Sequence, residues 1–253
     1  MLAGLRQARG RPLVVGHRGA MSHAPENTFA SFSLALQQGA DLVELDVHLT
    51  ADEVAVVIHD ETLERTTDGR GAVSRLTLAE LRQLDAGSWF GPAFAGERVP
   101  TLDEVLDWAA PRVPLAVELK GVPHPHPRLV EVVVGAIQHH AMLERVALIA
   151  FDHPALANAR ALEPRLQCGV LYACRPADPL ALARAVGAEA LLPHWSFVVA
   201  DDVARAQAVG LAFQPWETSD PDVIAALLAA GVDGIASNSP AVARRVAERF
   251  AVS

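Results

Sequence analysis

The chain alternates between two patterns of apolar residues. Short β-branched and apolar runs are followed by longer stretches rich in alanine and leucine, most of which end near a glycine. Short runs of this kind indicate buried strands, and the longer stretches indicate helices that pack against them. The predicted strands are 12–16, 42–48, 115–118, 146–151, 169–173, 190–194, 211–216 and 234–237.

This alternation predicts a single α/β domain over residues 1–253, a (β/α)₈ TIM barrel. The count reaches eight strands only if the β-rich run 54–58 leaves the barrel. We therefore expect residues 48–100 to form an insertion over the catalytic face, with a hairpin and a short helix, between strand two and its helix. A parallel strand at 54–58 would contradict this topology. A doubly wound open sheet is the alternative, but no Gly-x-Gly-x-x-Gly follows the first strand.

Local signals predict several helix boundaries. A helix is expected at about 27–38, followed by a glycine that closes it. The spans 77–80 and 101–104 each begin with threonine and end with glutamate, which is the spacing of a capping box. In the alanine-rich stretch near the C-terminus, Leu227 and Leu228 are expected to face the barrel.

Composition narrows the classes of partner. With 51% hydrophobic and 20% charged residues, the 253-residue chain is expected to be compact rather than disordered. Its net charge of −9 disfavours nucleic acids and anionic membrane surfaces, because a polyanion would be repelled over most of the surface. An anionic small molecule would need local cations to hold it.

Two features favour a cytoplasmic location. The N-terminus has three arginines before the first strand and lacks the apolar run and cleavage site of a secretory signal. Cys168 and Cys174 bracket one predicted strand, which at about 3.3 Å per residue keeps them too far apart to pair. No apolar run is long enough to span a membrane, so we expect no stable membrane association. The oligomeric state stays open.

Carboxylates occur where a barrel of this type has its active site, at the carboxyl ends of strands. Glu44 and Asp46 are two residues apart in one strand and therefore point to the same face, and Glu118 ends the next strand. Three hard oxygen ligands suit Mg²⁺ or Ca²⁺, and a bound cation would relieve their mutual repulsion. The alternative is a set of salt bridges to Arg18 and Lys120.

Two histidines are expected beside these carboxylates. His17 follows the first strand, and His59 follows the β-rich run that returns from the turn at 51–53. Counting outward from that turn places His59 opposite Glu44. Two imidazoles can divide general-base and general-acid duty near neutral pH.

Nearby basic and polar residues have simpler expected roles. Arg18 offers a planar fork for phosphate oxygens, and Lys120 offers a point charge that neighbouring carboxylates should keep protonated. Asn27 and Thr28 are expected to cap a helix rather than to take part in chemistry. The span 65–68, with an arginine and an aspartate at its ends, is expected to fasten the hairpin loop.

Six motifs in order along the chain resemble the signature series of the glycerophosphodiester phosphodiesterase family. They are His17-Arg18-Gly19, Pro25-Glu26-Asn27-Thr28, Glu44-Leu45-Asp46, His59-Asp60, Arg65-Thr66-Thr67-Asp68-Gly69 and Glu118-Leu119-Lys120, with later matches at 100–104 and 231–235. Any one motif is weak, whereas six in order are highly specific. The resemblance spans about residues 14–240. It implies a TIM barrel that uses a divalent cation to hydrolyse glycerophosphodiesters to glycerol 3-phosphate and an alcohol.

The resemblance also implies roles for single residues. Glu44, Asp46 and Glu118 would hold the metal, His17 and His59 would be the acid–base pair, Arg18 and Lys120 would bind phosphate, and Trp216 would contact the glycerol carbons. In the mechanism usually proposed for the family, a glycerol hydroxyl attacks phosphorus and the cyclic phosphate is then hydrolysed. The sequence does not choose between that route and direct attack by water.

Three positions depart from the family's usual pattern. Ala150-Phe151 stands where Ser-Phe is frequent, Asp52-Glu53 where Asp-Gly is common, and Trp216-Glu217-Thr218-Ser219 where Trp-Thr-x-Asn is usual. The metal and histidine positions are unchanged, so these differences bear on the substrate more than on the reaction. Glu217 either selects a cationic head group or lies in solvent, and solvent is the expectation because surface charges rarely act specifically.

Three alternative functions remain. A metal-independent aldolase would use Lys120 to form a Schiff base. A non-catalytic phosphate-binding barrel would need the two basic residues but not both histidines. Within the enzyme hypothesis, phospholipase D-type cleavage of lysophospholipids is the nearest alternative, and the lack of a membrane-anchoring stretch favours a small soluble substrate.

Overall fold

The computed structural model describes residues 9–121 and 125–251. Most of the N-terminal segment in which a secretory signal was sought therefore lies outside the described residues. Within them, no helix is long and apolar enough to cross a membrane.

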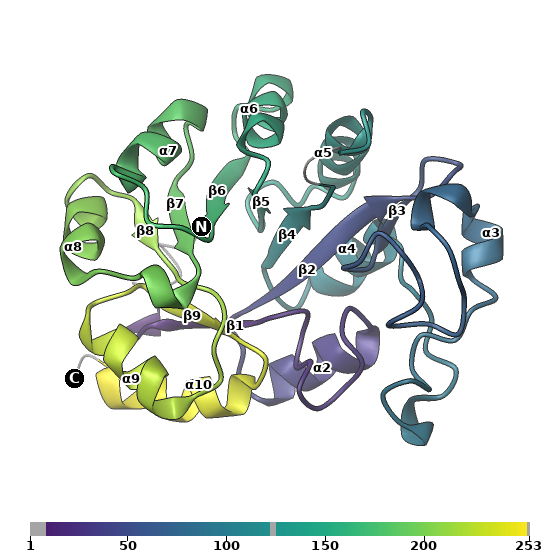
Figure 1. Cartoon of the computed structure of the whole chain (residues 1–253), viewed down its shortest axis with the longest axis horizontal. Coiled ribbons are helices and arrows are strands. Elements are labelled where there is room, and N and C mark those ends of the chain that lie inside the picture. Colours follow the sequence, from purple (N-terminus) through teal and green to yellow (C-terminus); the bar gives the residue numbers. More distant parts are fainter. Residues whose placement is uncertain (1–8, 122–124, 252–253) are drawn as a thin grey trace.

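Eight parallel strands form a nearly closed barrel with helices around its outside (Figure 1). The strands are β1 (Leu13–Gly16), β2 (Leu42–Leu49), β4 (Leu115–Leu119), β5 (Val146–Ala150), β6 (Gln167–Tyr172), β7 (Ala190–Pro193), β8 (Ala212–Phe213) and β9 (Gly234–Ser237), in the spatial order β8-β7-β6-β5-β4-β2-β1-β9. The chain thus has the predicted (β/α)₈ architecture. Each strand is followed by a helix, so the apolar faces of both are buried between the two layers.

The seam between β8 and β9 is closed by hydrogen bonds that begin at the last residue of the short strand β8 and continue beyond it. The Phe213 amide donates to the Asp233 carboxylate at 2.7 Å, and the Asp233 amide donates to the Phe213 carbonyl at 2.9 Å. Farther along, the Ala236 amide donates to the Pro215 carbonyl at 3.1 Å. These bonds bring the loops after β8 and β9 side by side at the mouth of the barrel.

The helices alternate with the barrel strands, and the predicted span 27–38 contains one of them, at residues 29–37. They are α2 (Phe29–Gln37), α3 (Leu78–Leu81), α4 (Leu102–Ala109), α5 (Leu129–His139), α6 (His153–Leu162), α7 (Pro179–Val186), α8 (Ala200–Ala208), α9 (Pro221–Ala229) and α10 (Pro240–Ala247). Short 3₁₀ helices lie at Val73–Arg75, Pro92–Phe94, Trp195–Phe197 and Glu248–Phe250. Both capping boxes are present, with Thr77 and Thr101 as the N-caps of α3 and α4. Leu227 and Leu228 of α9 lie in the main core, as expected.

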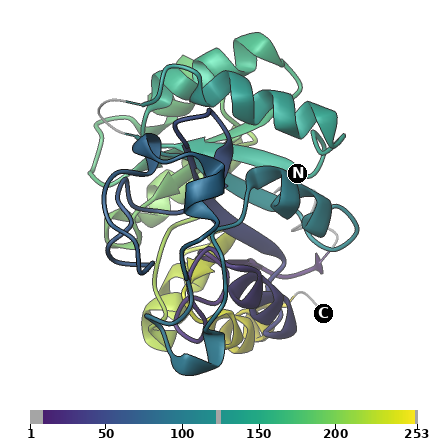
Figure 2. The same cartoon turned by 90° about the vertical axis from the view of Figure 1, so that its right-hand side faces the viewer.

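The segment between β2 and α4 leaves the barrel as an insertion with its own small core (Figure 2). Its strand β3 (Ala55–Val57) pairs with β2 in the antiparallel sense, which confirms that this run is not a barrel strand. The small core consists of Val56, Ile58, Leu63, Val73, Leu81, Ala86 and Val99. A core of its own lets the insertion hold a fixed shape beside the barrel.

The register of this hairpin differs from the expected one. Thr50 bonds to Val54 across a three-residue loop, and Leu49 pairs with Ala55. Continuing this register places His59 opposite Leu45, so the expected pairing with Glu44 was wrong by one residue. The last bond of the hairpin runs from the Ile58 amide to the Asp46 carbonyl, at 3.0 Å. His59 therefore leaves the paired region and reaches the site from a loop.

We predict that Gly19→Ala destabilises the fold more than a matched glycine substitution. Gly19 has φ +87°, and an added Cβ would lie 2.3 Å from the Ser31 hydroxyl oxygen and 2.7 Å from the Ser31 carbonyl oxygen. Left-handed strain and overpacking together should cost about 2–4 kcal/mol. Gly71→Ala is the control, because Gly71 has φ +99° but no atom within 4 Å of an added Cβ. Denaturant unfolding of both variants that gave equal losses would contradict this account.

Candidate active site

Three buried carboxylates meet at the carboxyl ends of β2 and β4. Asp46 lies opposite Glu118 in the parallel pairing of these strands, and Glu44 points to the same side as Asp46. Each residue offers a carboxylate oxygen, and the three oxygens lie within 4.8 Å of one another. The structure therefore brings together the three residues that the sequence nominated as metal ligands.

In two of these carboxylates, one oxygen accepts a hydrogen bond and the other accepts none. The Arg18 amide donates to Glu44 Oε2 at 2.9 Å, and the Asn27 side chain donates to Asp46 Oδ2 at 2.8 Å. Glu44 Oε1 and Asp46 Oδ1 are buried and accept no hydrogen bond from the described residues. A buried carboxylate oxygen without a donor is costly, and a divalent cation would satisfy both atoms. The donor set thus fits a hard metal ion.

Arg18 and Lys120 compensate part of the negative charge. Arg18 Nε lies 3.3 Å from Asp46 Oδ2, and Lys120 Nζ lies 2.8 Å from Glu118 Oε1 and 3.5 Å from Asp46 Oδ1. The salt bridges considered as the alternative to a metal therefore exist. Two basic side chains beside three carboxylates nevertheless leave an excess of negative charge.

The two basic side chains affect the pKa values of the three carboxyl groups unequally. Burial, followed by repulsion from Asp46 and Glu118, raises the pKa of Glu44 well above its usual value. Burial and the Asp46 charge raise the pKa of Glu118 to about 7, despite its bond to Lys120. Burial also opposes ionisation of Asp46, but Lys120 and Arg18 outweigh it and lower the pKa of this carboxyl. Without a further cation, Glu118 is therefore only partly ionised near neutral pH, and the pKa of Glu44 shifts in the same direction.

His17 and His59 both line the cavity beside these carboxylates. His17 Nδ1 lies 2.6 Å from Asn238 Oδ1, and its Nε2 lies 4.0 Å from Glu44 Oε2. Burial, aided by the Arg18 charge, lowers the pKa of His17 to about 4. His59 Nδ1 lies 2.6 Å from Asp60 Oδ1, and burial lowers the pKa of His59 as well. Each ring therefore has its Nδ1 held by a neighbour.

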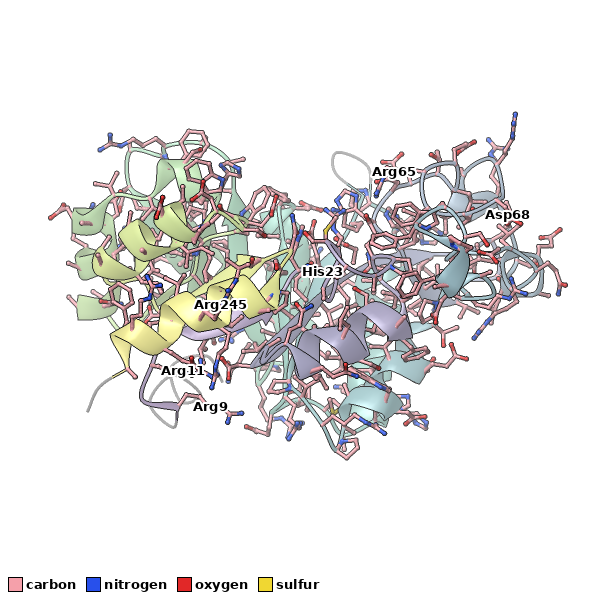
Figure 3. All side chains as sticks on the ribbon, turned by 90° about the horizontal axis from the view of Figure 1, so that it is seen from below. Arg9, Arg11, His23, Arg65, Asp68 and Arg245 are labelled. Carbon is pink, nitrogen blue, oxygen red and sulfur yellow. The ribbon has the colours of Figure 1, made fainter. Side chains whose placement is uncertain are left out.

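Arg65 ties the insertion to the barrel by salt bridges on two sides. Its guanidinium contacts Asp60 Oδ2 at 2.6 Å and both Glu26 oxygens at 2.6 and 2.9 Å, and Glu26 also accepts from Arg18 at 3.0 Å. Figure 3 shows Arg65 on the insertion, nearer to the barrel than Asp68. Arg65 does more than fasten the hairpin loop. It contacts Asp60, which holds His59, and Glu26, which holds Arg18, and so connects the two sides of the site. Glu26 belongs to one of the sequence motifs, but no local pattern in the sequence indicated that it would bind two arginines.

Asn27 does not cap α2, contrary to expectation. Thr28 is the N-cap and accepts from the Ser31 amide. Asn27 instead adopts φ +58°, and its amide turns to Asp46 across 19 residues of sequence. Asparagine tolerates this left-handed conformation better than most residues, so the backbone turn aims a donor at a candidate metal ligand. Sequence reasoning missed this because an asparagine before a threonine resembles an ordinary cap.

Glu44, Glu118, both histidines and both basic residues line one cavity of about 450 Å³. Trp216 forms part of its wall, where it packs edge-on against Phe151 at 5.3 Å and His194 at 5.1 Å between ring centroids. The Trp216 indole donates to the Leu192 carbonyl at 3.0 Å, which fixes the ring at the mouth of the barrel. The cavity thus has apolar aromatic side chains beside a group of charged ones.

Glu217 does not lie in open solvent, so that expectation was wrong. Its side chain is half-buried. Burial raises the pKa of Glu217, while the charges of Arg18 and His194 oppose that rise. The wall of the cavity includes Trp216 but, among the described residues, not Glu217.

Known proteins resemble this chain over nearly its whole length. The model of the glycerophosphoryl diester phosphodiesterase family matches residues 17–242. A glycerophosphodiester phosphodiesterase of Caldanaerobacter subterraneus subsp. tengcongensis is 38% identical, covering 91% of this chain and 95% of that protein, and one of Bacillus subtilis is 32% identical, covering 95% and 88%. A phosphodiesterase of Oleispira antarctica, solved in complex with the product sn-glycerol-3-phosphate, has a TM-score of 0.85 and 33% identity, covering 94% of this chain and 97% of that one. Because the family model and these relatives match nearly the whole chain, the chain belongs to the glycerophosphoryl diester phosphodiesterase family.

Proposed function

We propose that this protein is a divalent-metal-dependent phosphodiesterase that hydrolyses glycerophosphodiesters to glycerol 3-phosphate and an alcohol. The observation that carries the proposal is a cavity lined by two glutamates, two histidines and two basic side chains, with Asp46 clustered against the two glutamates. The relatives named for this activity and the related structure with its product support the same reaction. A phosphodiester has the size and charge that such a cavity would accept.

The metal in this proposal is Mg²⁺ or Ca²⁺, held by Glu44, Asp46 and Glu118. All three ligands are hard oxygens, which suits either ion. When bound, the ion would supply the positive charge that neutralises a phosphoryl group during displacement. The buried oxygens of Glu44 and Asp46 that accept no hydrogen bond from the described residues support this assignment.

Arg18 and Lys120 are proposed to hold the phosphate oxygens. Both side chains are largely buried at the rim of the carboxylate cluster, and the acidic neighbours raise the pKa of each against the effect of burial. Lys120 therefore stays protonated, which disfavours the Schiff-base aldolase hypothesis, because that chemistry needs a neutral amine. Trp216 is proposed to pack its indole face against the glycerol carbons.

His17 and His59 are proposed to transfer protons on opposite sides of phosphorus. Burial favours neutral His17, which can accept a proton from the attacking hydroxyl through Nε2. His59 is backed by the carboxylate of Asp60, which stabilises the protonated ring and suits a donor to the leaving oxygen. The proposal holds for attack by glycerol's own hydroxyl and for attack by water. The cytoplasmic location and the absence of a nucleic-acid partner stay predictions.

The test is an activity screen over several glycerophosphodiesters, with lysophosphatidylcholine included and products identified by ³¹P NMR. We expect glycerol 3-phosphate and free alcohol in the presence of Mg²⁺ or Ca²⁺. Exhaustive chelation should abolish turnover, and restoring the ion should recover it. Full turnover with the metal content verified to be nil would refute the metal requirement, and cleavage of the lysophospholipid alone would refute the substrate class.

We predict that metal binding releases protons, and that it releases fewer as the pH rises. The pKa of Glu118 is raised to about 7 and that of Glu44 is raised as well, so the metal-free site binds protons that the metal must displace. Calorimetric titrations at pH 6 and pH 9, in buffers of different ionisation enthalpy, would measure this release. Glu118→Gln should remove part of the release, whereas equal proton release at both pH values would contradict the assignment.

We predict that His17→Ala and His59→Ala each lower turnover by roughly 10²- to 10⁴-fold, with much smaller changes in substrate affinity. A substrate with a p-nitrophenol leaving group needs no acid, so it should restore His59→Ala and leave His17→Ala impaired. His139→Ala is the control, because His139 is exposed at the end of α5. Losses of only a few-fold in both variants would show that the pair is not catalytic.

A further inference from the structure

The cavity that holds the charged site continues down the inside of the barrel. Besides the residues at the mouth, its lining includes inward-facing residues of the strands and, beyond their amino ends, Arg160, Pro164, Arg165 and Gly210. These four residues precede β6 or β8, whereas the charged site lies where the strands end. The cavity therefore forms a channel that runs from the mouth toward the opposite end of the barrel.

A belt of small residues makes room for this channel. Five neighbouring strands, from β4 to β8, each give its lining a residue no larger than alanine, namely Ala116, Ala147, Gly169, Ala190 and Ala212. Bulky branched side chains usually fill the inside of a TIM barrel. The small residues leave a hollow instead, and Ile149, Leu171 and Leu192 give it an apolar wall.

A buried amide lies where the mouth meets the apolar part of the channel. Gln214 lines the cavity and lies between Ala212 and Trp216 in the sequence, two residues from each. It is only 6% exposed, and its Oε1 accepts no hydrogen bond from the described residues. A buried amide oxygen is costly without a donor, and a ligand hydroxyl at this level would supply one. The channel thus suits a molecule that is polar at the mouth and apolar below it.

The arginines at the far end of the channel are already paired with carboxylates. Arg160 donates to Glu189, and Arg165 donates to both oxygens of Glu163. This end therefore offers a phosphate little net positive charge. The anionic end of a ligand belongs at the mouth, and its apolar end points into the barrel.

We propose that the inside of the barrel binds a single alkyl or acyl chain of a phosphodiester whose phosphate lies at the mouth. The proposal rests on the proposed function, which places the phosphate beside Arg18 and Lys120. At about 3.3 Å per residue and a strand tilt of about 36°, the stretch from Phe151 to Ala147 spans about 11 Å along the barrel axis. With C–C bonds of about 1.5 Å, an extended chain of roughly eight carbons covers that length. Such a chain ends before the ion pairs at the far end.

The first test measures binding without turnover. The probes are n-alkyl phosphates from butyl to dodecyl, which are monoesters, titrated by calorimetry with Mg²⁺ present and below their micelle concentrations. Affinity should rise about two- to fourfold per added methylene up to roughly eight carbons and then level off. Affinity that does not depend on chain length would show that the channel holds only water. A steady rise up to dodecyl phosphate would indicate an open apolar surface, and either result would overturn the proposal.

Two variants fill the channel from different strands. Ala147→Leu on β5 and Ala212→Leu on β8 should each weaken binding of octyl phosphate by about tenfold or more, because the added side chain takes the place of the alkyl chain. Ala181→Leu is the control, because Ala181 is exposed on α7 and does not line the cavity. Unchanged affinity for octyl phosphate in both channel variants, with circular dichroism like the parent's, would overturn the proposal. The chain-length series of the parent needs no substitution, so it decides the matter if a variant does not fold.

The second test identifies which ester group carries the chain. It compares kcat/KM for 1-octanoyl lysophosphatidylcholine, with the chain on glycerol, and for a glycerophosphodiester of octanol, with the chain on the alcohol, each relative to glycerophosphocholine. At least one ratio should exceed about ten in the parent and fall about tenfold in Ala147→Leu, but not in Ala181→Leu. Hydrolysis of glycerophosphocholine with neither chain-bearing diester preferred would overturn this proposal and leave the proposed function intact. Chain-length-dependent binding in a protein that hydrolyses no diester would refute the proposed function alone.

Discussion

The structure depends on the compensation of three carboxylates buried at one end of a hydrophobic barrel. Glu44, Asp46 and Glu118 come from two adjacent parallel strands, so the sheet itself holds their oxygens within 4.8 Å of one another. Arg18 and Lys120 offset this charge in part, but burial and repulsion between the carboxylates still raise the pKa values of the two glutamates. The residual negative charge favours binding of a divalent cation. The cation and the two basic side chains can then bind one anion together.

The insertion completes the site because salt bridges hold it against the barrel. Arg65 bonds to Asp60 on its own segment and to Glu26 on the β1–α2 loop, and Glu26 bonds to Arg18. His59, which leaves the hairpin beyond its last paired residue, is oriented by Asp60 at 2.6 Å. The position of one proposed proton donor therefore depends on an ion-pair network, whereas His17, directly after β1, is positioned by a neighbouring barrel loop.

Local sequence patterns could predict much of this structure. The two-residue spacing of Glu44 and Asp46 placed both on one face, and the strand count excluded residues 54–58 from the barrel. The predicted hairpin register was wrong by one residue. Counting outward from the observed three-residue loop at 51–53 pairs His59 with Leu45 and not with Glu44. The two histidines, and with them the motif series that indicated the family, also came from the sequence.

The connections between those residues could not be predicted in the same way. Asn27 reaches Asp46 only because its backbone adopts φ +58°, and Glu26 and Arg65 are 39 residues apart. Glu217 was expected in solvent because nothing in the linear sequence shows that the β8 and β9 loops lie together. Contacts of this kind are set by closure of the barrel, which a local pattern does not encode.

The most direct measurement of the central claim is a crystal structure of the protein with Mn²⁺ and glycerol 3-phosphate, with the ion located by its anomalous scattering. We expect one strong peak bonded to oxygens of Glu44, Asp46 and Glu118, with the phosphate reaching Arg18 and Lys120. An ion bound elsewhere, with the three carboxylates still paired only to Arg18 and Lys120, would contradict the claim.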